Sequence, residues 1–176
     1  VYLQVQTGRT RSTGYDRERL VMLYTPTSEI HDHIDAVRNE IIQSNAATQV
    51  AESLNKMTGI SFTINELDWD GSGARRDISF GSVNVSPGFG KTIGWKIIRG
   101  RDFLSTPGAD SLALIINETA AKLMRLEKPE GTIVKHTAFG KTENYTIVGV
   151  IEDMLMESPY ESIRPTFYLA NRDKGN

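Results

Sequence analysis

Residues 112–126, Leu-Ala-Leu-Ile-Ile-Asn-Glu-Thr-Ala-Ala-Lys-Leu-Met-Arg-Leu, join a predicted strand directly to a predicted helix. The apolar run 112–116 is too short for a typical helix and suits a buried strand. Asn117 is a favoured N-cap residue, and 118–126 is rich in strong helix formers. Pro129 and Gly131 follow and predict that the helix has ended by that point.

Further short strands are predicted on both sides of this unit, because apolar or alternating runs are separated by turn residues. These runs lie at 60–64, 78–85, 96–98, 133–134, 145–151 and 166–169. The first two flank a turn at 68–73 and predict a hairpin. A short helical turn is expected before 96–98. Strands therefore outnumber helices, and we predict an α+β fold.

The first third of the chain predicts a βαβ unit over residues 20–57. An apolar stripe recurs there at helical spacing, at Ile30, Ile34, Val37 and Ile41. We expect this stripe to be buried against a sheet. The apolar run 20–24 before it and the alternating run 50–54 after it predict two parallel strands joined by a right-handed crossover. The β-rich remainder begins after Gly59.

Composition excludes several classes of function. The chain has 176 residues, with 20 Lys and Arg against 22 Asp and Glu, so the net charge of −2 argues against nucleic acid as a partner. It contains no cysteine, which excludes disulfides, thiol catalysis and cysteine-ligated zinc. No apolar run approaches the ~20 residues that span a bilayer. No signal peptide is visible, and a start at Val1 suggests that an upstream segment has been removed.

Two segments resemble the tail of a phosphate-binding loop: Gly90-Lys91-Thr92 and Gly140-Lys141-Thr142. The motif requires a further glycine five positions earlier, where this chain has Val85 and Lys135. Neither segment leads from a strand into a long helix. We therefore interpret both as ordinary turns and predict that the chain binds no nucleotide.

Other candidate sites have simple structural interpretations. His31 and His33 are two residues apart on a predicted helix, so their rings point about 200° apart and cannot readily share a metal. The segment Asp68, Asp70, Gly71 and Gly73 imitates part of a calcium loop, but a hairpin turn is favoured.

Two pairs of neighbouring charged residues are candidates for catalysis or anion binding. Glu152 and Asp153 are adjacent on a strand and face opposite ways, so they cannot flank one substrate atom. Arg99 and Arg101 share a face and could bind an anion, although a solvated strand edge is favoured. We predict no catalytic residue, no cofactor and no metal site.

An ordered set of short motifs runs through the second half of the chain. These motifs are Thr92-Ile93-Gly94-Trp95, Gly100-Arg101-Asp102-Phe103, 115–121, Pro129 with Gly131, 145–153, and Ser158 with Arg164-Pro165-Thr166-Phe167-Tyr168. In order and spacing, the set resembles the extracytoplasmic domain of MacB-like, FtsX-type permease subunits of ABC transporters. Gly14-Tyr15-Asp16 extends the resemblance to nearly the whole chain.

Three positions depart from the family pattern. Arg125 stands where the helix usually ends with glycine, Glu130 replaces an apolar residue, and Ser86-Pro87-Gly88 interrupts a turn that commonly contains aspartate and tyrosine. A non-glycine residue in the left-handed conformation costs about 1 kcal/mol. Arg125 therefore predicts an altered or strained helix exit.

The resemblance implies a porter-like βαβ part at 1–58 and a β-rich, sabre-like part at 59–176. It implies a non-catalytic domain on the periplasmic side of the bacterial inner membrane, anchored in the full-length protein, that transmits ATP-driven motion. The implied partners are a second permease copy, the cytoplasmic ABC ATPase acting through the membrane helices, and a periplasmic adaptor or substrate protein.

Two further expectations accompany the resemblance. A second βαβ unit of the family would lie beyond Asn176, so residues 20–57 are expected to expose apolar surface and strand edges. The alternative function is a module that captures a peptide, lipid or antimicrobial in a cleft between the two parts. Enzymatic activity is a third, less favoured interpretation, because no set of residues has the spacing that it needs.

Overall fold

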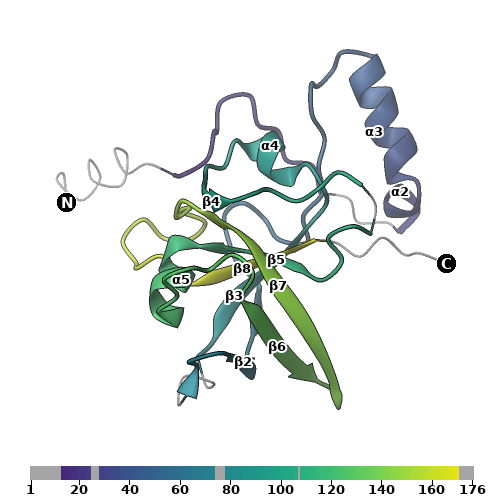
Figure 1. Ribbon diagram of the computed structural model, residues 1–176. Helices are drawn as coiled ribbons and strands as arrows, with labels where there is room; N and C mark the ends of the chain where they lie inside the picture. Colours follow the sequence, from purple (N-terminus) through teal and green to yellow (C-terminus); the bar gives the residue numbers. More distant parts are fainter. Residues whose placement is uncertain (1–12, 25–27, 74–77, 107, 171–176) are drawn as a thin grey trace.

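The computed structural model describes residues 13–24, 28–73, 78–106 and 108–170 (Figure 1). The elements follow one another as α2 (Ser28–Asp32), α3 (Ile34–Gln43), β1 (Phe62–Ile64), β2 (Leu67–Trp69), β3 (Phe80–Val85), α4 (Phe89–Ile93), β4 (Ile97–Gly100), β5 (Ala113–Asn117), α5 (Glu118–Met124), β6 (Ile133–Ala138), β7 (Lys141–Ile151) and β8 (Thr166–Ala170). The predicted α+β class is confirmed. Among the described residues, no helix is both long and apolar enough to cross a membrane.

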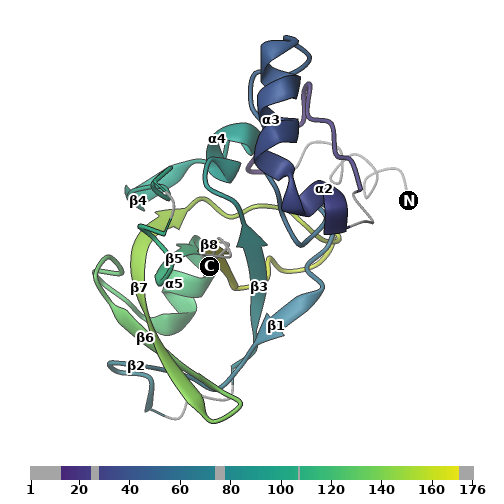
Figure 2. The same cartoon turned by 90° about the vertical axis from the view of Figure 1, so that its right-hand side faces the viewer.

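The eight strands of the described residues belong to one curled sheet (Figure 2). Its order is β1-β3-β8-β5-β7-β6-β2, and β4 pairs with β7 beside this path. β1 and β2 lie at opposite ends of the order, yet only residues 65–66 separate them in the chain. The sheet must therefore curl to bring its two ends together. Two of its pairings are parallel, β3 with β8 and β5 with β7, and the others are antiparallel.

The curled sheet carries a hydrophobic core on each face, because successive side chains of a strand point to opposite sides. In β5, Ile115 belongs to the core that also contains α4, and Ile116 to the core that also contains α5. Both are fully buried, as are Phe167 and Tyr168 on β8, which divide between the cores in the same way. Burying a side chain of this size contributes about 1.5–3 kcal/mol.

The strand–helix unit predicted from 112–126 is confirmed. The Asn117 side-chain oxygen accepts a hydrogen bond from the Ala120 N–H at 3.0 Å, which caps α5. The same oxygen accepts from the Thr166 N–H at 2.9 Å, so the cap also ties α5 to β8. The helix ends at Arg125, which has a φ of 57° and lies in the left-handed region. The exit is therefore not altered: Arg125 adopts the left-handed conformation that favours glycine, which corresponds to the strained alternative of the prediction.

The two strands of the hairpin predicted over 60–85 are confirmed, and they correspond to β1 and β3. β1 pairs with β3 in antiparallel register, with Thr63 opposite Gly81. Between them the chain forms an additional strand, β2, which pairs with β6. The sequence pattern missed β2 because its partner is more than 60 residues away.

The prediction of a βαβ unit over residues 20–57 is wrong, because neither of its two strands forms. Residues 20–24 are not in a strand, and Val21, Leu23 and Tyr24 are 77%, 76% and 83% exposed. The run 50–54 forms only an isolated antiparallel bridge, between Ser53 and Val85. A strand needs a neighbouring strand with free backbone groups. The pairing of β3 with β1 ends at Ser82, and beyond it the run 50–54 is bonded through the Leu54 N–H to the Asn84 carbonyl and the Ser86 N–H to the Glu52 carbonyl, which make one antiparallel bridge and no parallel strand.

The helix predicted in this region exists, but it is divided and poorly buried. α2 and α3 are separated at His33, and α3 has no buried residue among those described. Ile34, Val37 and Ile41 are only half-buried, and Ile30 is exposed. The expected burial of this stripe against a sheet is therefore wrong, because no strand lies against it in the described chain.

Candidate functional site

The motif residues 92–103 fold into a compact junction between α4, β4 and the sheet. Trp95 is buried, and its ring lies 5.2 Å from that of Tyr168 and 5.7 Å from that of Phe89, both in edge-to-face geometry. Edge-to-face pairs are favourable beyond their buried area. The Trp95 indole N–H donates to an Asp102 carboxylate oxygen at 3.1 Å. Trp95 therefore connects α4, the residues after β4, and β8.

Three charged residues of this junction, Arg101, Asp102 and Asp110, have hydrogen-bond partners within it. The Arg101 guanidinium donates to both carboxylate oxygens of Asp110, at 2.7 and 2.8 Å. This hydrogen-bonded pairing lowers the pKa of Asp110 and raises the pKa of Arg101. Asp102 behaves differently, because burial raises its pKa against the lowering effect of its bonds to Phe103 and Trp95. Arg101 and Asp110 bind each other, and the Asp102 carboxylate binds Trp95 and the Phe103 N–H, so these charged groups serve the structure of the junction.

Glycines let the backbones of this junction approach closely. A Cβ on Gly149 of β7 would lie 2.2 Å from the Arg101 carbonyl oxygen, and one on Gly100 would lie 2.2 Å from the Val148 carbonyl oxygen. A Cβ on Gly90 would lie 1.9 Å from the Trp95 indole nitrogen. Contacts this short do not occur, so each glycine is required by packing. The motifs that carry the resemblance therefore build a rigid connection between elements.

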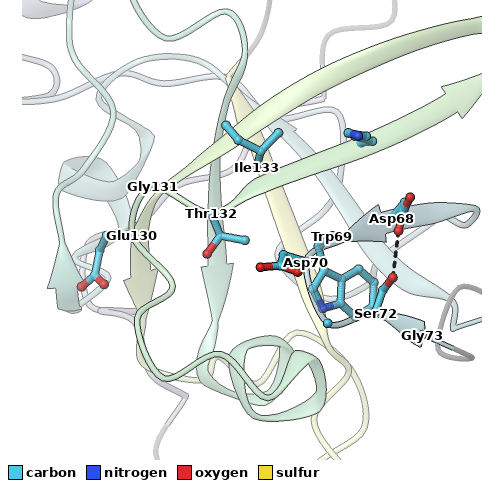
Figure 3. A pocket seen from close by; sticks show the side chains of 11 residues that line it. Asp68, Trp69, Asp70, Ser72, Gly73, Glu130, Gly131, Thr132 and Ile133 are labelled. Carbon is cyan, nitrogen blue, oxygen red and sulfur yellow. Dashed lines mark hydrogen bonds between the residues drawn. The ribbon is translucent and has the colours of Figure 1, made fainter.

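A surface groove of about 780 Å³ lies beside the start of β6 (Figure 3). One wall is formed by β2 and the turn after it, with Asp68, Asp70 and Ser72, and the other runs from Glu130 to Ile133 and Lys135. Ser72 donates to Asp68 at 2.8 Å, which fixes the turn. Three carboxylates against one lysine make the lining acidic.

The chemistry of this acidic groove is limited. No group of three or more carboxylate or histidine side chains in the described chain has the geometry to hold a metal ion. Trp69 lines the groove, but it is buried and packs edge-to-face on Phe80 at 6.2 Å. Asp68 lies within β2 and Asp70 in the turn that follows, so the turn predicted at 68–73 begins only after Trp69.

A second groove of about 490 Å³ lies between β4 and α5, and it is lined by Ile98, Arg99, Lys122, Arg125, Glu127 and Pro129 among others. Arg99 donates to the Glu127 carbonyl oxygen at 2.7 Å. Arg101 is committed to Asp110, so the two arginines predicted to share a face bind different partners. The structure therefore does not bring them together as an anion site.

The remaining candidates are also placed by the structure. Gly90-Lys91-Thr92 lies in the five-residue α4, and Gly140-Lys141-Thr142 lies at the β6–β7 turn. Neither precedes a long helix. His33 separates α2 from α3, and the side chain of His31 is not among those described. Asp153 accepts from the backbone and hydroxyl of Thr119 at 2.9 and 2.7 Å, whereas Glu152 lies near Lys96.

Two important residues were missed by sequence reasoning. Asp110 has no local motif, because its partner Arg101 is brought to it by a loop. Phe139 lies in the turn between β6 and β7, fully exposed and with a positive φ of 51°. The Phe-Gly pair between two β runs is a turn signal, but it does not show that the ring remains free of contacts.

Comparison with known proteins identifies the fold class. No protein-family model and no curated protein matches the chain. In fold, it matches a domain of a protein described as a permease from Porphyromonas gingivalis (TM-score 0.50, 20% identity). It also matches the periplasmic region of MacB from Actinobacillus actinomycetemcomitans (0.51, 15%) and the extracellular domain of the noncanonic ABC-type transporter YknZ from Gram-positive bacteria (0.52, 17%).

The three matches cover most of this chain but a smaller share of the proteins that it matches. The match to the Porphyromonas gingivalis domain covers 74% of this chain and 54% of that domain. The match to the MacB region covers 91% of this chain and 63% of that region. The match to the YknZ domain covers 84% of this chain and 70% of that domain. The chain therefore has the fold of the extracytoplasmic domains of ABC transporter permeases. The resemblance stated from the motifs is confirmed at the level of fold.

Proposed function

We propose that this chain is a non-catalytic extracytoplasmic domain of an ABC transporter permease, which transmits ATP-driven motion across the membrane. The observation that carries the proposal is the junction of residues 92–110, where motif residues build a rigid connection. A body that transmits displacement must not deform internally, and close-packed interiors are weakly compressible. Two cores on opposite faces of one sheet supply such a body, and Trp95 packs within the core beside α4, against Tyr168 of β8.

The location and partners that we propose for this domain are based on the proteins that share its fold. In it, the domain stands on the periplasmic side of the bacterial inner membrane, anchored in its full-length protein, and works beside a second permease copy. A cytoplasmic ABC ATPase moves the membrane helices, and the domain acts on a periplasmic adaptor or substrate protein. Residues 1–58 would form the membrane-proximal, porter-like part, and 59–176 the sabre-like part.

Two observations bear on this division. Residues 51–57 are tied to β3, because the Leu54 N–H donates to the Asn84 carbonyl and the Ser86 N–H donates to the Glu52 carbonyl. Met57 belongs to the core beside α4. The connection across the proposed boundary is therefore firm, and displacement of the first part would be passed to the sheet.

The alternative, ligand capture in a cleft between the two parts, receives less support. Neither groove described above includes a residue from 1–58. The acidic groove is lined mainly by charged or polar side chains, and half of the residues that line the second groove are charged, whereas ligand pockets are predominantly apolar.

Spin-label distances in the full-length transporter test the proposal. Cysteine pairs are easily introduced, because this chain contains no cysteine. Labels at exposed Lys91 of α4 and Asn144 of β7 report the interior of the domain, and a single label at Asn144 reports the distance between copies. Trapping the ATPase with nucleotide should change the distance between copies and leave the internal distance constant. A changed internal distance, or an unchanged distance between copies, would contradict the proposal.

A further inference from the structure

The tip of the β6–β7 hairpin, residues 137–142, extends beyond the rest of the sheet. β2 pairs with β6 only as far as His136, and β5 pairs with β7 only from Thr146 onward. The tip is therefore a two-stranded ribbon in which Thr137 faces Thr142 and Ala138 faces Lys141. Both views place it at the end of the molecule opposite α3 (Figures 1 and 2).

Phe139 at this tip is not a residue type that this kind of turn favours. Phe139 and Gly140 have φ values of 51° and 74°, the positive values that a type I′ hairpin turn requires. Asparagine or glycine is favoured at the first of these positions, and a bulky residue there is an outlier. The phenyl ring is fully exposed, so it contributes no packing in the described structure. Neither turn geometry nor core burial explains a phenylalanine at this position.

The ribbon nevertheless holds Phe139 in a fixed place. At its base, Val134 and Tyr145 are buried in the core beside α5. Closer to the tip, the hydroxyl groups of Thr137 and Thr142 are hydrogen-bonded at 2.9 Å. An aromatic side chain presented on a fixed backbone loses little entropy on binding, which favours its use as an anchor.

We propose that this hairpin tip docks into an apolar pocket on a separate protein, with Phe139 as the inserted anchor. The tip is convex and its charge is balanced, because the Lys141 ammonium lies 3.1 Å from a Glu143 carboxylate oxygen. A concave pocket with an uncharged rim complements such a surface. Single aromatic anchors in desolvated pockets commonly dominate binding between proteins.

Two other occupants fit the tip less well. A membrane is disfavoured because stable anchoring takes two signals, and the tip offers one ring and one lysine that is already paired. A second copy is disfavoured because two such tips bury far less than the ~1,200–2,000 Å² of a stable symmetric interface. Insertion into either groove of a neighbouring copy would be a head-to-tail contact, which need not close, and both grooves are rich in charge.

The first test asks whether folding needs the ring. Asparagine accepts positive φ better than phenylalanine, so Phe139→Asn in the full chain should raise Tm by about 2 to 4 °C or at least not lower it. A lower Tm would show that Phe139 serves folding and would overturn the proposal.

The second test identifies the occupant by photo-crosslinking the full chain in the cells that produce it. A benzoyl-phenylalanine at position 139 is compared with one at Phe62, an exposed aromatic on β1. We expect a discrete protein adduct at 139 alone, which mass spectrometry then identifies. An adduct with lipid, an adduct with a second copy, or no adduct beyond the Phe62 control would each overturn the proposal.

The identified protein is then purified and titrated against the full chain. Phe139→Asn should weaken binding at least about tenfold, whereas Phe139→Tyr should keep it within about threefold. Equal binding by wild type and Phe139→Asn would overturn the role of the ring. This outcome is separate from a failure of the proposed transmission function, because it depends on no nucleotide.

Discussion

Two isoleucine-containing regions of this protein differ strongly in how deeply their apolar side chains are buried. In α3, Ile34 and Ile41 recur at helical spacing and remain half-buried. In β5, Ile115 and Ile116 are adjacent in the chain and both fully buried, one in each core. The difference lies in the neighbours, since β5 has strands on both sides and helices over both faces, whereas α3 has no strand against its apolar stripe. An apolar pattern gives the local structure, but only neighbouring elements complete its burial.

The largest expected effect contrasts these regions directly. Phe167→Ala, in the core beside α5, should lower the free energy of unfolding by about 3–5 kcal/mol, because it leaves a cavity among fully buried side chains. Ile34→Ala should cost about 1 kcal/mol, since its side chain is only half-buried. Urea unfolding measures both. Equal costs would show that α3 is packed as firmly as the sheet.

The next effect tests close backbone approach within the sheet. Gly149→Ala should cost about 3 kcal/mol, because its Cβ would overlap the Arg101 carbonyl oxygen and neither backbone can move aside freely. Gly59→Ala is the matched control, since a Cβ there has no atom within 4 Å, and it should change stability by less than about 0.5 kcal/mol. A neutral Gly149→Ala would mean that β4 and β7 are less tightly joined than the junction requires.

The third comparison sets an ion pair of the junction against one in α3. Asp110→Asn should cost about 2 kcal/mol at neutral pH, because the Asp110 side chain is buried and bonded twice by Arg101. Asp35→Asn should cost about 0.5 kcal/mol or less, since Asp35 pairs with Arg38 on the surface. Thermal or urea unfolding distinguishes the two.

The pH dependence of this stability has a defined sign. The folded pKa of Asp110 is lowered, so its contribution is present above its unfolded pKa near 3.9 and is lost as the pH falls through the folded value. The folded pKa of Asp102 is raised, so ionising it opposes folding as the pH rises from its unfolded toward its folded value. The cost of Asp110→Asn should therefore shrink in acid. A cost that stays constant down to about pH 2 would contradict the assigned pairing.

The smallest expected effect is local. Amides of α3 should exchange with solvent through openings that need only about 0–2 kcal/mol, because the helix has no buried residue in the described structure. Amides of β5, which is paired on both sides, should open only with global unfolding. Hydrogen exchange followed by mass spectrometry measures the contrast. Equal protection of the two segments would show that the exposed face of α3 is covered in solution.

Local chemistry made part of this structure predictable. The N-cap at Asn117, the helix after it and most strands follow from side chains that act within a few residues of each other. The absence of a nucleotide motif was also a local conclusion, drawn from Val85 and Lys135 in the positions of the required glycines. The motif order added the fold class, which the comparisons confirm.

The sequence by itself therefore determined the α+β class and the strand–helix unit at 112–126, and its motifs contained most residues of the junction but not Asp110. Only the tertiary structure decided that 20–24 and 50–54 form no strands and that Arg101 pairs with Asp110. It also decided that Phe139 stands free at a hairpin tip. The physical reason is that strand pairing, burial and buried ion pairs depend on partners far away in the chain, which a local pattern does not specify.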